Sequence, residues 1–190
     1  KPITYYVHEE GGKFKSKIQP KSLKRYSYAI SDDTQKFIDD TFSKLDPLID
    51  LDFKRVNSPV GAMIRIYQID ELDDSPGWMT EDKNSPNYYV EVYFSMNQYK
   101  YLKMKNYPNL TVDAAFTIAH EIGHALGLEH REGGSLSQYT KFNIDPDDVR
   151  INNRNTIMSY NNFMYADEEN FFTELDIKAL RHVWGVEKGN

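Results

Sequence analysis

The stretch AHEIGHALGLEHR, residues 119–131, contains three of the five histidines of this chain. His120 and His124 are four residues apart, so on an α-helix both side chains project from the same face, one above the other. Gly127 can adopt the left-handed backbone conformation that ends a helix, and His130 follows three residues later. The fold therefore has to provide one helix, one sharp turn and a place where three imidazoles meet.

This spacing predicts a catalytic zinc ion bound by His120, His124 and His130. Three protein ligands leave the fourth position of a tetrahedral zinc open, whereas a structural zinc has four protein ligands. Glu121 is about 100° further round the helix, beside the ion, where it can accept a proton from zinc-bound water. The competing interpretation is that these are ordinary histidines on an amphipathic helix. A chance match to His-Glu-x-x-His-x-x-Gly-x-x-His is expected in on the order of one in 10⁵ chains of this length.

Composition and charge exclude several other classes of protein. The 190 residues carry a net charge of −6, which argues against nucleic acid as a partner, and the absence of cysteine excludes disulfides and thiolate metal sites. No apolar run approaches the roughly 20 residues that span a bilayer, so no membrane span is expected, and no signal peptide is expected at Lys1. The acidic stretch DELDD, residues 70–74, is a candidate calcium site, because calcium prefers clustered carboxylates.

Strands are expected where β-branched and aromatic residues alternate with polar ones between turn residues. Five segments meet this description: 3–7, 25–30, 51–56, 62–69 and 88–96. Residues 70–87 are expected to form a long polar loop, and about 25 residues after His130 are expected to be irregular.

Three helices are expected. The first spans 32–45, with Ser31 as its N-cap, and the second runs from about Thr111 to Leu126 and ends at Gly127. The third begins with a capping box of Thr173 and Asp176 and ends before Gly185. This order predicts a single α+β domain over 1–190, with a mixed upper lobe over about 1–130 and a small irregular lower lobe over about 131–190.

The motif HEIGHALGLEH, together with NTIMSY at residues 155–160, resembles the zinc motif and methionine turn of the metzincin metalloendopeptidases. The segments ITYYV, LDFKRV and AMIRIYQI near the start, and FTELDIKALRHVWG at the end, place the resemblance closest to the serralysin and matrix-metalloproteinase-like branch. It implies a metzincin-like catalytic domain, in which a twisted mixed sheet and two helices lie above a cleft and a third helix lies below.

The resemblance also implies roles for three further residues. Met158 would form the floor of the zinc site, and Asp176 would be tied to the backbone of the methionine turn, although local helix capping alone would also explain an aspartate there. Tyr160 would be an additional zinc ligand that swings away and hydrogen-bonds the oxyanion; the alternative is a buried tyrosine that packs the lower lobe. Arg131 matches none of the residues that these families have after the third histidine, which leaves the subfamily open. His8 and His182 lie outside the motif and are expected to be exposed.

The sequence therefore predicts a zinc-dependent endopeptidase in which Glu121 activates the water, with protein or peptide substrates, one zinc ion and a monomeric chain. By resemblance, the protein is expected to be secreted, and its substrate is expected to lie extended and to pair antiparallel with an edge strand from residues 76–94. The alternative is a catalytically silent zinc-binding module that binds peptides, or an interaction domain whose cleft is plugged by residues 131–155. The presence of Glu121 speaks against a silent module, since a structural zinc site does not need that carboxylate.

Overall fold

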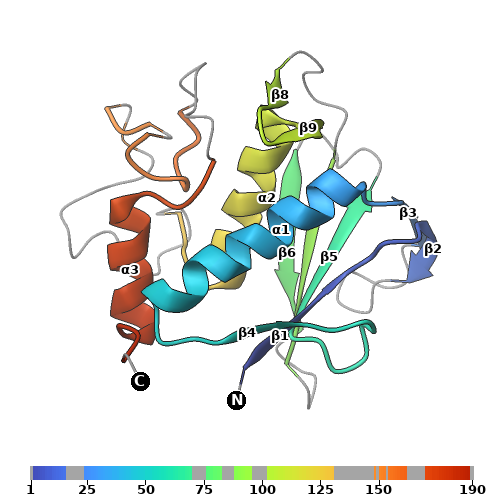
Figure 1. Ribbon diagram of the computed structural model, residues 1–190, viewed down its shortest axis with the longest axis horizontal. Helices are drawn as coiled ribbons and strands as arrows, with labels where there is room; N and C mark the ends of the chain where they lie inside the picture. Colours follow the sequence, from blue (N-terminus) through green and yellow to red (C-terminus); the bar gives the residue numbers. More distant parts are fainter. Residues whose placement is uncertain are drawn as a thin grey trace.

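A twisted mixed sheet with helices on one face forms the described part of the chain, which confirms the predicted α+β class (Figure 1). This computed structural model describes residues 2–15, 24–69, 76–82, 88–95, 102–130, 148, 150–152, 154–161 and 170–188. Its elements in chain order are β1 (Ile3–Val7), β2 (Gly12–Lys15), β3 (Lys24–Tyr28), α1 (Asp32–Leu45), the short 3-10 helix η1 (Asp46–Leu48), β4 (Phe53–Arg55), β5 (Ile64–Ile69), β6 (Gly77–Glu81), β7 (Val90–Phe94), β8 (Lys103–Met104), β9 (Tyr107–Thr111), α2 (Val112–Ala125) and α3 (Glu174–Trp184).

The sheet is parallel at its centre and antiparallel at its edges. Strands β4, β1, β5 and β7 lie side by side in this order and run in the same direction. Strand β6 pairs antiparallel with β7 and is the outermost described strand on that side. On the side of β5 that also carries β1, strand β3 pairs antiparallel with the end of β5, and β2 pairs antiparallel with β3.

The two faces of the sheet bury different side chains. On the helix side, Ile66 of β5 and Val92 of β7 are fully buried in the main core with residues of α1 and α2. On the opposite face, Tyr67 and Tyr93 form a second buried cluster, and the ring of Phe14 stacks on Tyr67 with centroids 4.4 Å apart. Alternation along each strand produces this division, because successive side chains point to opposite faces.

Helices α1 and α2 begin as the sequence predicts. Ser31 caps α1 by accepting a hydrogen bond from the backbone N–H of Thr34, and Thr111 caps α2 by accepting one from Ala114. The predicted apolar stripe of α1 is buried; its members are Phe37, Ile38, Thr41, Phe42 and Leu45. Satisfying the first N–H groups of each helix in this way fixes where the helix starts.

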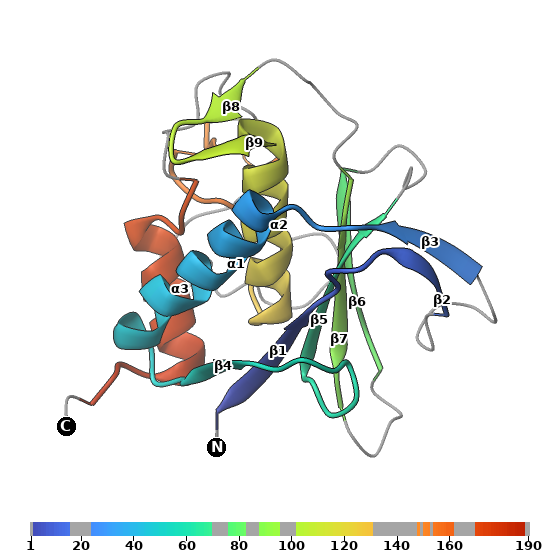
Figure 2. The ribbon, with the colours of Figure 1, turned by 45° about the vertical axis from the view of Figure 1, so that its right-hand side comes forward.

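Helix α3 lies on the far side of α2 from the sheet (Figures 1 and 2). Its predicted capping box is present, with Thr173 and Asp176 each accepting a hydrogen bond from the other's backbone N–H. At its other end, Trp184 Nε1 donates to the Leu126 carbonyl over 2.8 Å, and Arg181 Nε donates to the Leu48 carbonyl over 2.8 Å. Helix α3 is therefore held at both ends, and its last turn is tied to the end of α2.

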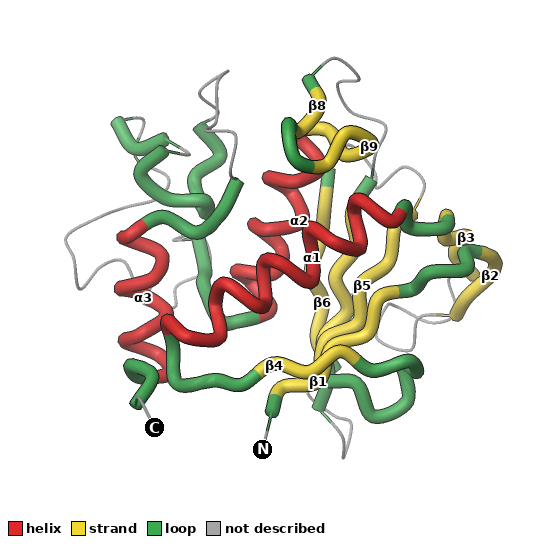
Figure 3. Tube along the Cα trace, viewed as in Figure 1, coloured by secondary structure: helices red, strands yellow, loops and turns green. Residues whose placement is uncertain are grey.

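The strand predictions needed correction. Residues 77–81 form β6, although the whole of 70–87 was expected to be loop, and the pairings β2–β3 and β8–β9 were not expected. The predicted strand 51–56 is shorter in the structure, where β4 covers only Phe53–Arg55 and the chain on either side of it runs as loop (Figure 3). A short strand such as β6 is stabilised by pairing with a partner that is distant in sequence, in this case β7, which local sequence patterns do not reveal.

Some predictions fall outside the described residues: the candidate calcium stretch 70–74, Arg131 and most of the 131–155 loop. Among the helices of the described residues, none is long and apolar enough to cross a membrane.

Candidate metal centre

Helix α2 carries two of the three clustered histidines and ends immediately below them. His120 and Glu121 are buried, with 5% and 6% of their surface exposed. The helix ends at Ala125 with Leu126 as its C-cap, Gly127 follows with a φ of 93°, and the Leu128 N–H returns to the Gly123 carbonyl over 2.9 Å. This left-handed residue reverses the chain, as the sequence predicts, and brings His130 back towards the helix.

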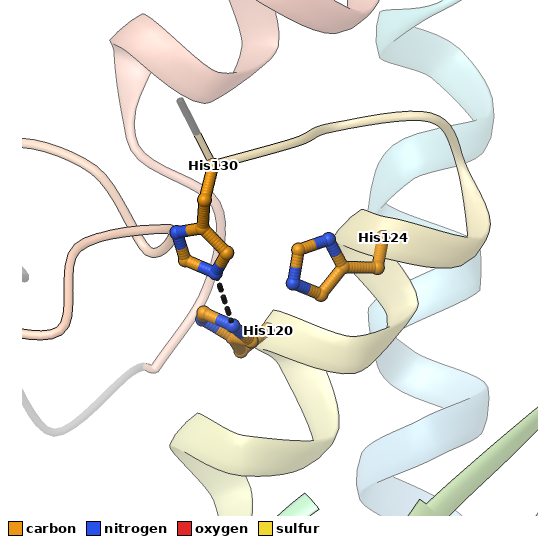
Figure 4. A group of neighbouring side chains, drawn as sticks. All are labelled: His120, His124 and His130. Carbon is orange, nitrogen blue, oxygen red and sulfur yellow. Dashed lines mark hydrogen bonds between the residues drawn. The ribbon is translucent and has the colours of Figure 1, made fainter. Parts of the chain in front are cut away.

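The three imidazoles meet at one point (Figure 4). One nitrogen from each of His120, His124 and His130 lies within 4.8 Å of the others, and this is the group of potential metal ligands found among the described residues. The Nε2 atoms of His120 and His130 are 3.1 Å apart. Two nitrogens bound to one tetrahedral zinc at 2.0–2.1 Å would be separated by about 3.3 Å. This nitrogen pair therefore already has the spacing that zinc requires.

Backbone carbonyls fix which nitrogen of two rings faces this point. His120 Nδ1 is 2.8 Å from the Ile157 carbonyl, and His124 Nδ1 is 2.8 Å from the Leu128 carbonyl. A carbonyl oxygen can only accept, so each Nδ1 carries the hydrogen and each Nε2 presents its lone pair. Hydrogen bonds of this kind, made by the ring nitrogen that does not bind the metal, orient metal-binding histidines. The donor set fits zinc, and it does so without any ligand from cysteine.

Burial keeps the cluster uncharged at neutral pH. It lowers the pKa of His120 to about 3, assisted by the neighbouring His124, and it lowers the pKa of His130 to about 4 for the same two reasons. The pKa of His124 is also lowered, chiefly by burial. A histidine must be neutral to bind a metal, so protons do not compete for these nitrogens near pH 7.

Glu121 lies one residue beyond His120 and faces strand β6. Burial raises the pKa of its carboxyl group to about 8. A Cβ atom on Gly77 of β6 would lie 2.4 Å from Thr117 Cγ2 and 2.9 Å from Glu121 Cγ, so only glycine lets the strand approach the helix this closely. The role of Gly77 could not be predicted from the sequence, because a glycine after a proline indicates a turn and not a strand in contact with a helix.

The methionine turn lies against α2 on the side of the cluster. Met158 is fully buried, and its Sδ would be 2.9 Å from a Cβ atom on Gly123, which lies between the two helical histidines. Ile157, the preceding residue, provides the carbonyl that holds His120. The turn therefore both packs against the helix and orients one of its imidazoles.

Asp176 connects this turn to α3. Its carboxylate is fully buried and accepts from the Ile157 backbone N–H over 3.0 Å, the Thr156 hydroxyl over 2.5 Å and the Thr173 backbone N–H over 2.8 Å. The two explanations that the sequence left open, helix capping and attachment of the methionine turn, both describe contacts of this one side chain.

Tyr160 lies over the cluster. Its side chain is 66% exposed, and its ring stacks on that of His130 with centroids 4.1 Å apart and planes 19° from parallel. The alternative of a buried tyrosine that packs the lower lobe is therefore wrong. A stacked ring at the solvent boundary can move without disturbing the core.

The two histidines outside the motif have different environments. His182 is exposed on α3, as expected. His8 was expected to be exposed but is half-buried: its Nδ1 is 2.8 Å from the Tyr6 hydroxyl, and its ring lies near Tyr67 and Phe14. The aromatic cluster on the outer face of the sheet covers it.

Comparisons with known proteins agree with this geometry. The family model described as Matrixin matches residues 15–158. The matched range includes the three histidines, Glu121 and Met158, and it covers the sheet from β3 onward and α2. A comparison with curated proteins found no match.

We predict that the purified protein binds about one equivalent of zinc and that His124→Ala retains less than about half an equivalent, because one of three ligands is lost. Metal analysis after dialysis measures this. The matched control is His182→Ala, which removes an exposed histidine and should leave the zinc content unchanged. An unchanged zinc content in His124→Ala would contradict the ligand assignment.

Asp176→Ala is expected to lower the free energy of unfolding by about 3–5 kcal/mol, because several buried donors lose their acceptor. Urea denaturation followed by circular dichroism measures the loss. Glu174→Ala, an exposed acidic residue in the same helical turn, should leave the transition almost unchanged. If Asp176→Ala lost less than about 1 kcal/mol, which is the typical contribution of one hydrogen bond, the carboxylate would not be the main attachment of the turn.

In zinc-free protein, Glu121→Gln is expected to be more stable than the wild type, by a margin that grows with pH. The folded-state pKa is raised from 4.5 to about 8, so stability from this group is complete below the unfolded-state pKa and is lost as pH rises towards 8. Glutamine does not titrate. Thermal midpoints measured between about pH 5 and about pH 8 should therefore diverge. The exposed control Glu174→Gln should show no divergence, and a constant margin for Glu121→Gln would mean that the carboxyl group is not buried.

Proposed function

Because the chain belongs to the matrixin family of zinc-dependent metalloendopeptidases, we propose that it hydrolyses internal peptide bonds of protein substrates, with one zinc ion held by His120, His124 and His130. The observation that carries this proposal is the arrangement at the end of α2. Two imidazoles with carbonyl-fixed tautomers and a third from the reversed chain converge beside a buried glutamate.

The metal would supply the electrophile. When bound, zinc lowers the pKa of a water molecule to about 7, polarises a carbonyl oxygen and favours the ionised form of a nearby carboxyl group. The chain's own contribution is to keep three nitrogens neutral and aimed at one point, and to leave room for the reacting groups.

Glu121 is the general base in this proposal. Its carboxylate accepts a proton from the attacking water and returns it to the nitrogen of the leaving amine. Burial makes this carboxylate a stronger base than an exposed glutamate, because the neutral form is favoured in an apolar environment. The contact with β6 at Gly77 limits the space that the side chain can occupy.

Tyr160 is the proposed second catalytic group. Stacking on His130 holds its ring beside the metal ligands, and its exposure allows the hydroxyl to move when substrate enters. In the free enzyme the phenol oxygen would be a further zinc ligand; with substrate bound, the hydroxyl would donate a hydrogen bond to the oxyanion that develops on the scissile carbonyl.

The proposed substrate is an extended protein segment that adds to the sheet beside β6. This strand is the outermost described strand next to α2, and pairing with it would carry the scissile bond past Glu121. We further propose that residues 1–190 form one catalytic domain with the two lobes described above, which acts outside the cell as a monomer.

Glu121→Ala is expected to reduce peptide hydrolysis by ~10²–10⁴-fold while the protein keeps its zinc and its fold, because general-base removal typically costs that much. Turnover of a quenched peptide and metal analysis of the same sample measure both properties. Glu174→Ala is the matched control and should have wild-type turnover. If Glu121→Ala retained more than about a tenth of wild-type turnover, another group would have to activate the water.

Tyr160→Phe is expected to keep its zinc, to lower kcat more than it raises KM, and to retain detectable activity. A lost oxyanion donor costs ~10²–10³-fold in other hydrolases, and a mobile donor assisted by a metal should cost less. Steady-state kinetics measure the effect. Tyr26→Phe, an exposed tyrosine on β3, should behave as wild type. Wild-type kinetics in Tyr160→Phe would leave this residue only a packing role.

A further inference from the structure

A hollow of about 760 Å³, including space open to solvent, lies where α2 ends and adjoins His124. Most of its wall is apolar and comes from the sheet, the end of α2 and Trp184 of α3. Its polar residues include Glu81 at the end of β6, Tyr88 before β7, and Glu129, which precedes His130. No lysine or arginine is among the described residues that line it.

The hollow lies along β6, beyond the point where Gly77 approaches Glu121. Helix α2 and strand β6 lie side by side and run in the same direction (Figures 1 and 2). Gly77 approaches Glu121, whereas Met79 and Glu81, which point to one face because they are two residues apart, both line the hollow. They are two and four residues beyond Gly77, or about 7 and 13 Å at 3.3 Å per residue.

This direction fixes which part of the substrate reaches the hollow. A substrate paired antiparallel with β6 runs from Glu81 towards Gly77, so its N-terminal part lies over the hollow and its scissile bond lies near Glu121. The side chain that enters therefore belongs to a residue two to four positions before the scissile bond.

The lining fits a long side chain with a positive end. An apolar wall accommodates an aliphatic stem, and carboxylates can pair with its charged head. The Tyr88 hydroxyl donates to Glu81 Oε2 over 2.8 Å, which orients this carboxylate. Glu129 immediately precedes His130 and lines the hollow together with His124, so it lies close to the proposed zinc ligands.

We propose that this hollow selects lysine or arginine two to four residues before the scissile bond, through Glu81 and Glu129. The proposal rests on the proposed peptidase function and on pairing of the substrate with β6.

The test compares zinc-loaded protein on peptides that are identical except for lysine or norleucine at the second, third or fourth position before the bond. Norleucine keeps the aliphatic stem and removes the charge. At one of these positions the lysine peptide should have a kcat/KM about fivefold higher, because an exposed ion pair contributes up to about that factor. The preference should decrease with added salt. Cleavage of both peptides at equal rates at all three positions overturns this proposal alone, whereas cleavage of neither overturns the proposed function as well.

Variants then assign the preference to the two carboxylates. In the Glu81→Gln, Glu129→Gln double variant the lysine-to-norleucine ratio should fall towards one, and Glu81→Lys should favour a glutamate peptide over the lysine peptide. The ratio cancels any loss of bound zinc, which affects both peptides equally. Glu174→Gln is the control and should keep the wild-type ratio. An unchanged ratio in the double variant would overturn the assignment of these residues.

Discussion

The buried carboxylate of Asp176 connects the parts of this molecule that make up the candidate metal centre. It accepts from the N-terminal turn of α3 through Thr173 and from the methionine turn through Thr156 and Ile157. The carbonyl of Ile157 in turn holds the Nδ1 of His120. A continuous path of hydrogen bonds therefore runs from α3 through the methionine turn to the imidazole of His120, and these three segments are far apart in sequence. A fully buried acidic side chain is tolerated here because several hydrogen-bond donors replace its hydration.

The same low-dielectric surroundings shift the pKa values of the ionisable groups in the candidate centre. Burial disfavours the charged forms of both imidazoles and carboxyl groups, so it keeps His120 neutral and raises the pKa of Glu121. A neutral imidazole can bind a metal, and a carboxyl group with a raised pKa can hold a proton in transit. The surrounding core stabilises these otherwise unfavourable groups, with α2 packed on β7 and on the methionine turn.

Local signals explain what could be predicted from the sequence. The starts of all three helices at Ser31, Thr111 and Thr173, and the reversal at Gly127, depend on residues within a few positions, and the structure has each of them. The histidine spacing is local in the same sense, since two of the three lie on one helix. The family match supports the resemblance that these motifs indicated.

What could not be predicted depends on distant partners. Strand β6 exists because β7 pairs with it, and Gly77 matters because α2 approaches it. His8 is half-buried because Phe14 and Tyr67 come from other strands. The contact of Tyr160 with His130 likewise joins two loops that are thirty positions apart in the printed sequence.

We propose that three histidines and one glutamate, on α2 and in the turn after it, form the active site of a zinc-dependent endopeptidase. Cleavage of casein by zinc-loaded, metal-stripped and zinc-restored protein tests it most directly. Cleavage should stop when a chelator removes the metal and should return when about one equivalent of zinc is added back. Cleavage that continues at the original rate in fully metal-free protein would contradict the claim.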